Sequence, residues 1–72
     1  MTSVAVTRRR RKDVLHLMAL GWRYEVIAEE LGLPVATVQQ DGYAILQRLG
    51  MTRQLELVVA AWKAGQESLR NR

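Results

Sequence analysis

Two groups of side chains in this sequence are chemically suited to contact a nucleic acid. Gln39, Gln40 and Tyr43 are polar, uncharged residues at the spacing of one helix face. A glutamine amide can offer adenine a donor and an acceptor together, and an exposed tyrosine can contact a base edge, a thymine methyl group or a phosphate. The consecutive cations Arg8, Arg9, Arg10, Arg11 and Lys12 are suited to phosphates or to the minor groove. Both groups favour DNA contact over the alternatives of a solvated helix face and a solvated charge run.

Residue types needed for catalysis or metal binding are not grouped in this sequence. The chain has no cysteine and a single histidine, His16, with no carboxylate cluster beside it. It shows no nucleophile–base pair and no phosphate-binding loop. We therefore expect no enzymatic activity, no metal and no cofactor, and we place His16 on a helix surface.

Length and charge narrow the class of protein further. The 72 residues suffice for one domain, and the net charge of +4 favours a polyanionic partner. No apolar run approaches the ~20 residues of a membrane span, and no signal-peptide core follows the arginine run. We expect a cytoplasmic protein, bacterial or phage-encoded, with no membrane contact.

The periodicity of apolar residues predicts four helices and no strand. Glycines at 21, 32 and 50 are placed to end the first three helices, and Pro34 favours the start of the third. The expected helices cover residues 9–20, 24–31, 35–49 and 53–64. The corresponding organisation is a flexible basic N-terminal arm over 1–8, a helix-turn-helix domain over 9–65 and a frayed tail over 66–72.

Each predicted helix has an apolar stripe that should face the core. We expect Trp22 to pack over the first two helices and Leu33 to plug the turn before the third. Gly42 costs roughly 1 kcal/mol of helix propensity relative to alanine, which suggests close approach of another backbone, such as that of the second helix. The expected inward residues are Val14, Leu15, Met18 and Ala19, then Ile27, Ala28 and Leu31, then Val38, Gly42, Ile45 and Leu49.

Asp41 is the acidic residue of the predicted third helix. The simplest interpretation is a surface aspartate near Arg48. Three functional alternatives are open: repulsion of phosphate, a tuned contact to a cytosine amine, and adaptation of this face to a protein partner.

The core and turn residues resemble those of the LuxR/GerE-type DNA-binding domain, a four-helix module of bacterial transcription regulators. The resemblance covers about residues 14–65 and predicts an all-α, four-helix LuxR-type helix-turn-helix fold. It implies that the third helix enters the major groove and that the fourth often forms a dimer contact. Matched features are Val14-Leu15, Leu17-Met18-Ala19, Gly21, Ile27-Ala28, Leu31, Leu33, Thr37-Val38, Ile45, Leu49-Gly50, Glu56 and Val58-Val59.

Carried over to this chain, the resemblance assigns DNA contacts along the third helix. Gln39, Gln40 and Tyr43 would face the bases, and Thr37 would bond a phosphate. The residues near the groove edge would be Val35, Ala36 and Gln47.

The predicted fourth helix is apolar on two sides, which is typical of a helix buried on more than one side. One stripe suits the domain core: Leu55, Val58, Val59 and Trp62. The other suits a two-fold partner helix, because small side chains allow close approach: Leu57, Ala60, Ala61 and Ala64. The alternative is an alanine-rich exposed face.

We therefore expect a stand-alone, sequence-specific transcription regulator that binds double-stranded DNA as a homodimer. The alternative is a helix-turn-helix module reused as a protein-interaction adaptor on RNA polymerase or another transcription factor.

Overall fold

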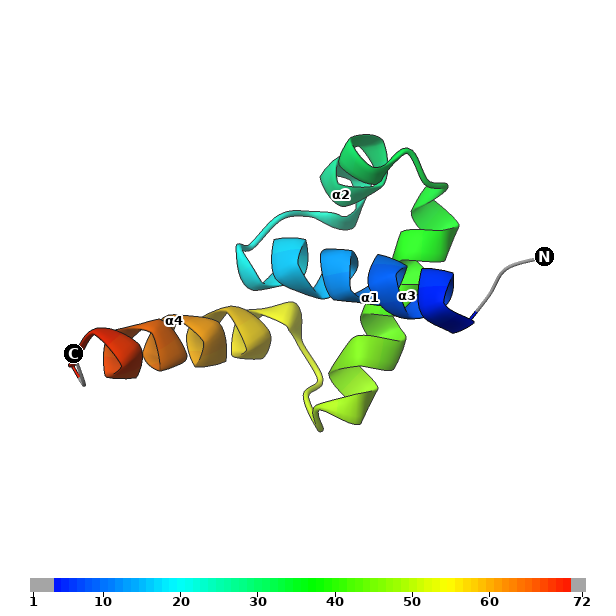
Figure 1. The fold of residues 1–72 in the computed structure, drawn as a ribbon. Coiled ribbons are helices and arrows are strands. Elements are labelled where there is room, and N and C mark those ends of the chain that lie inside the picture. Colours follow the sequence, from blue (N-terminus) through cyan, green and yellow to red (C-terminus); the bar gives the residue numbers. More distant parts are fainter. Residues whose placement is uncertain (1–3, 71–72) are drawn as a thin grey trace.

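The computed structural model describes residues 4–70 of the chain, and all regular secondary structure in that range is helical. The four helices are α1 (Val4–Ala19), α2 (Tyr24–Leu31), α3 (Val35–Arg48) and α4 (Gln54–Arg70) (Figure 1). The predicted all-α fold of four helices is confirmed at this level.

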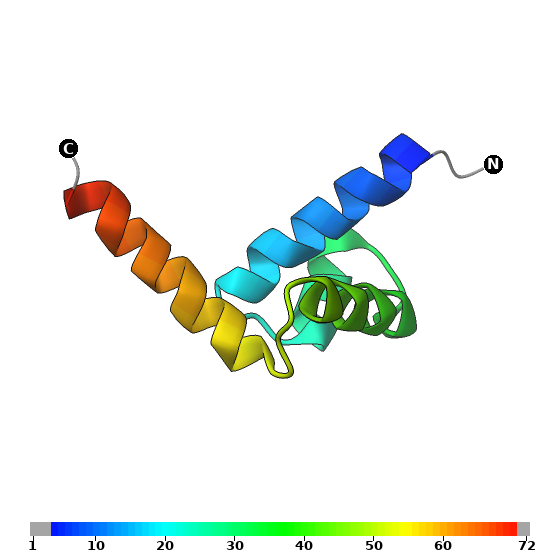
Figure 2. The same ribbon diagram turned by 90° about the horizontal axis from the view of Figure 1, so that it is seen from below.

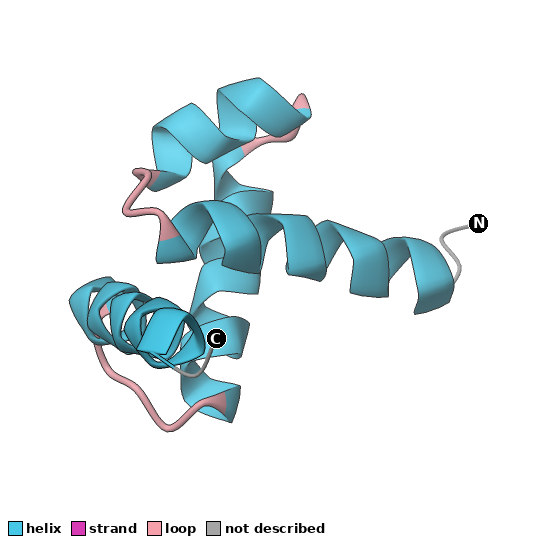
Figure 3. Ribbon diagram, turned by 60° about the vertical axis from the view of Figure 1, so that its left-hand side comes forward, coloured by secondary structure: helices cyan, strands magenta, loops and turns pink. Residues whose placement is uncertain are grey.

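The helices are arranged around α1, which packs against each of the other three. α2 also packs against α3, and Figure 3 shows the short turn that joins these two helices. α4 extends away from the other helices and makes a V with α1 (Figure 2). The molecule is consequently elongated, with extents of 43 × 23 × 23 Å.

A small core collects apolar side chains from all four helices. Trp22 and Leu33 pack against this core from the two loops that flank α2, as the sequence predicts. Since the chain has no disulfide, burial of these apolar side chains is the main source of stability. The core residues are Val14, Met18, Ile27, Ala28, Val38, Ile45, Leu46 and Leu57.

The first and last helices are longer than the sequence analysis predicts. α1 begins at Val4, so residues 4–8 continue the helix and do not form a flexible arm, while residues 1–3 lie outside the described range. No glycine or proline interrupts this segment, and Arg10 ties the helix to α3. α4 runs to Arg70 through most of the predicted tail, and residues 71–72 lie outside the described range.

The last residue of the inward stripe of α3 is Leu46, and not Leu49 as predicted. Leu46 is only 6% exposed and lies in the core, whereas Leu49 is 49% exposed. α3 ends at Arg48, and Leu49 is the capping residue of the turn that follows. Leu49 therefore lies on the surface.

The assignment of faces on α4 is wrong for its larger side chains. Leu57, predicted in the dimer interface, is 7% exposed and lies in the core, whereas Leu55 and Trp62, predicted inward, are 66% and 64% exposed. The side-chain amide of Gln54 donates to the carbonyl oxygens of Met18 (3.0 Å) and Trp22 (2.8 Å). This clamp fixes the first turn of α4 so that position 57, three residues on, faces the core.

Candidate nucleic-acid interface

A tight turn connects α2 to α3 and sets the angle between them. Gly32 ends α2 at φ 65°, in the left-handed region that glycine adopts without steric cost. The N–H of Leu33 then donates to the carbonyl of Ala28 at 2.9 Å, and Pro34 is extended at ψ 143° before α3 begins. The bond to Ala28 holds the entry to α3 against the end of α2.

One side of α3 is exposed and uncharged, and we call it the polar face: Ala36, Gln40, Tyr43 and Gln47. These residues follow one another at steps of four, three and four, so they share one side of the helix. Val35, at the start of the helix, is also exposed, whereas Thr37 and Gln39 are half-buried at its edges. The polar face offers amide and phenol groups to a partner. Gln39, which the resemblance assigns to base contact, is half-buried at the edge of this face.

Tyr24 of α2 contacts Tyr43, a residue of the polar face. The rings of Tyr24 and Tyr43 meet edge to face, with centroids 6.3 Å apart. A Cβ atom on Gly42 would lie 2.6 Å from the hydroxyl oxygen of Tyr24, so this side chain explains the glycine. The expected close approach of another backbone is replaced by an aromatic ring. Partial burial raises the pKa of Tyr24, and the neighbouring Tyr43 adds to this effect.

Asp41 is buried and paired, whereas the simplest interpretation of the sequence places it on the surface. Its side chain is 3% exposed, and Arg10 of α1 binds both carboxylate oxygens, with Nε–Oδ2 at 2.7 Å and Nη2–Oδ1 at 3.0 Å. Arg11 adds a second cation, its Nε 3.6 Å from Oδ1. The hydrogen bond to Asp41 raises the pKa of Arg10 despite partial desolvation. Asp41 is therefore a buried ion-pair residue and not a surface aspartate beside Arg48.

Some cations of the basic run are exposed, and others lie beside Asp41. Arg8, Arg9 and Lys12 are exposed on α1. Arg10 and Arg11 are half-buried and lie toward Asp41, and the bidentate pair occupies two nitrogens of Arg10. Arg10 therefore leaves the predicted group of phosphate contacts.

The position of Asp41 in the sequence indicates that its carboxylate is buried. Position 41 lies three residues after Val38 and four before Ile45, so it belongs to the inward side of the third helix. A buried carboxylate needs a cationic partner, and the arginine run offers several. The pattern does not say which arginine reaches it, because the pairing depends on how α1 crosses α3.

No protein-family model, curated protein or solved structure matches the chain. Within the described range, no three histidine, cysteine or acidic side chains are grouped to hold a metal ion. No helix in that range is long and apolar enough to cross a bilayer. The proposal for function therefore rests on the geometry of α2 and α3 and on the cations of α1.

Proposed function

We propose that this chain is a sequence-specific DNA-binding domain of the LuxR type that regulates transcription. In this proposal the polar face of α3 enters the major groove, with α2 and its tight turn setting the angle of entry. The four helices and the turn residues are consistent with the sequence resemblance that suggested this function.

The observation that carries the proposal is the absence of negative charge from the polar face. Asp41, the acid of α3, is turned inward and neutralised by Arg10. The exposed Gln40, Tyr43 and Gln47 can therefore approach base edges without a carboxylate opposing the phosphates.

Exposed cations elsewhere on the domain supply the nonspecific part of the proposed binding. Arg8, Arg9 and Lys12 are exposed on α1, and Arg48 is exposed at the end of α3. Contacts from such residues to phosphates give affinity and salt dependence, whereas base contacts give sequence preference.

We further propose a homodimer through α4, with an interface different from the predicted one. Leu55, Val59 and Trp62 form an exposed apolar stripe at steps of four and three, with exposed fractions of 66%, 41% and 64%. Exposed Trp and Leu side chains in one stripe favour burial against a partner. A two-fold dimer would present two copies of α3, as recognition of paired half-sites on a duplex requires.

Selection of bound duplexes from a random pool tests the proposal. We expect one sequence to be enriched, and its affinity to fall linearly with salt on a logarithmic plot, with a slope of about 0.9 per phosphate contact. Replacing Arg8 and Arg9 by alanine should flatten that slope. Replacing the exposed loop residues Arg23 and Arg53 by alanine is the matched control. Absence of both enrichment and salt-dependent duplex binding by the folded protein would overturn the proposal.

A further inference from the structure

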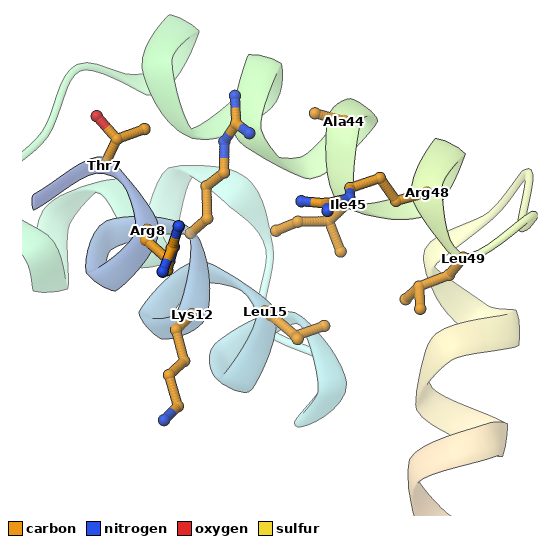
Figure 4. Close-up of a pocket in the computed structure, with 9 residues that line it drawn as sticks. Thr7, Arg8, Lys12, Leu15, Ala44, Ile45, Arg48 and Leu49 are labelled. Carbon is orange, nitrogen blue, oxygen red and sulfur yellow. The ribbon is translucent and has the colours of Figure 1, made fainter. Parts of the chain in front are cut away.

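An open groove runs between the middle of α1 and the C-terminal half of α3 (Figure 4). It has a volume of about 660 Å³. We call it the α1–α3 groove and define it by Arg8, Lys12 and Leu15 of α1, Ile45 and Arg48 of α3, and Leu49 in the turn after α3.

The groove combines an apolar floor with a cationic rim. Leu15 and Ile45 point toward the space between the two helices, and the half-exposed Leu49 extends this strip toward α4 (Figure 4). Its lining includes four cations and no acidic residue. Within the range that the structure describes, Arg8, Lys12 and Arg48 form no ion pair. The rim therefore has positive charge that a ligand could neutralise.

The α1–α3 groove and the polar face are lined by different residues of α3 and of the turn that follows it. Ile45 lies on the inward side of α3, whereas Gln40, Tyr43 and Gln47 lie on the opposite side, because each residue turns the helix by about 100°. A ligand in the groove therefore leaves the polar face uncovered.

We propose that the α1–α3 groove binds an acidic amphipathic helix of a protein partner. A helix laid in a groove inserts apolar side chains spaced three and four residues apart, and its flanking carboxylates would pair with Arg8, Lys12 and Arg48. Arg8 to Leu15 span about 10 Å along α1, which matches roughly two turns of such a helix. This inference does not depend on DNA binding.

Two other occupants fit the groove less well. Nucleic-acid phosphates can pair with the same rim cations, as proposed above, but they would leave Leu15 and Leu49 in contact with water. An acidic helix in the groove would compete with them for Arg8, Lys12 and Arg48. A small amphipathic anion would normally be buried over most of its surface, which an open groove does not provide. The acidic helix satisfies both the floor and the rim.

A fluorescent designed peptide of about four helical turns, with leucines on one face and glutamates beside them, tests this proposal. Fluorescence anisotropy should show saturable binding. Two control peptides, one with lysine for each glutamate and one with serine for each leucine, should bind at least about tenfold more weakly, a loss of about 1.4 kcal/mol.

Variants of the protein locate the binding site. Arg48→Glu and Leu49→Ser should each weaken binding of the leucine–glutamate peptide about tenfold or more. The matched control is Arg23→Glu, an exposed arginine outside the groove, which should bind like the unmodified protein. Circular dichroism establishes that each variant is folded.

Three results would overturn the proposal: no saturable binding of the peptide, equal binding of the lysine peptide, or no effect of Arg48→Glu and Leu49→Ser. Weaker duplex binding by Arg48→Glu without any peptide binding would assign the rim to DNA. If the peptide binds as expected but duplexes show neither enrichment nor salt-dependent binding, the groove proposal stands and the proposed DNA function falls.

Discussion

The ion pair between Arg10 and Asp41 joins α1 to α3 over 31 positions of sequence and removes the charge of Asp41 from the surface. Its two partners differ in burial, since the side chain of Arg10 is 28% exposed and that of Asp41 3%. An arginine left alone can turn toward water, whereas a carboxylate left alone stays buried. Losing the arginine should therefore cost more than losing the acid.

We expect Arg10→Ala to lower the free energy of unfolding by roughly 1–3 kcal/mol, because it leaves a buried carboxylate without its main donor. Asp41→Asn should cost less. The matched control is Arg9→Ala, which replaces an exposed arginine one position away and should change stability by about 0.5 kcal/mol or less. Urea denaturation measures all three. Equal effects of Arg10→Ala and Arg9→Ala would contradict the structural role of the pair.

The contact of Gly42 with Tyr24 gives a second prediction. Gly42→Ala should destabilise the domain, because the clash with the tyrosine ring outweighs a gain in helix propensity of roughly 1 kcal/mol. In a Tyr24→Ala background the clash is absent, so the same substitution should become stabilising. Thermal denaturation of the two single variants and the double variant checks this change of sign. A stabilising effect in both backgrounds would show that the ring yields without cost.

Three large apolar side chains of α4 are exposed. Leu57 belongs to the core, while Leu55, Val59 and Trp62 face away from it. The smaller side chains of the predicted interface, Ala60, Ala61 and Ala64, are exposed as well. For the proposed dimer, the larger side chains of Leu55, Val59 and Trp62 favour their stripe over the alanine stripe as the contact surface.

We expect Trp62→Glu to convert a dimer to a folded monomer, because it places a charge in the apolar contact. Ala64→Glu, on the other exposed stripe, is the matched control and should leave the dimer intact. Leu57→Glu should instead unfold the domain, since it buries a carboxylate in the core. Analytical ultracentrifugation with circular dichroism separates these outcomes. A protein that is monomeric without any substitution, or a dimer disrupted only by Ala64→Glu, would contradict the proposed interface.

In the molecule as a whole, several helix ends and turns could be predicted from the sequence, whereas contacts between residues far apart in the chain could not. The limits of α2 and the glycine ends at 21, 32 and 50 follow from periodicity and from turn chemistry, which act within a few residues. The pairing of Arg10 with Asp41 and the clamp of Gln54 join residues more than 30 positions apart. These contacts depend on how the helices cross, and they change which residues of α3 and α4 face solvent.

The affinity of Gln40→Ala for selected and random duplexes tests most directly whether the polar face of α3 reads bases, as proposed. The substitution should cost roughly 1–3 kcal/mol on the selected duplex and relax the preference at one base pair, with little change on random duplex. Gln66→Ala, an exposed glutamine on α4, is the matched control and should match the unmodified protein on both. Equal loss on selected and random duplexes, or no loss on either, would contradict the proposal.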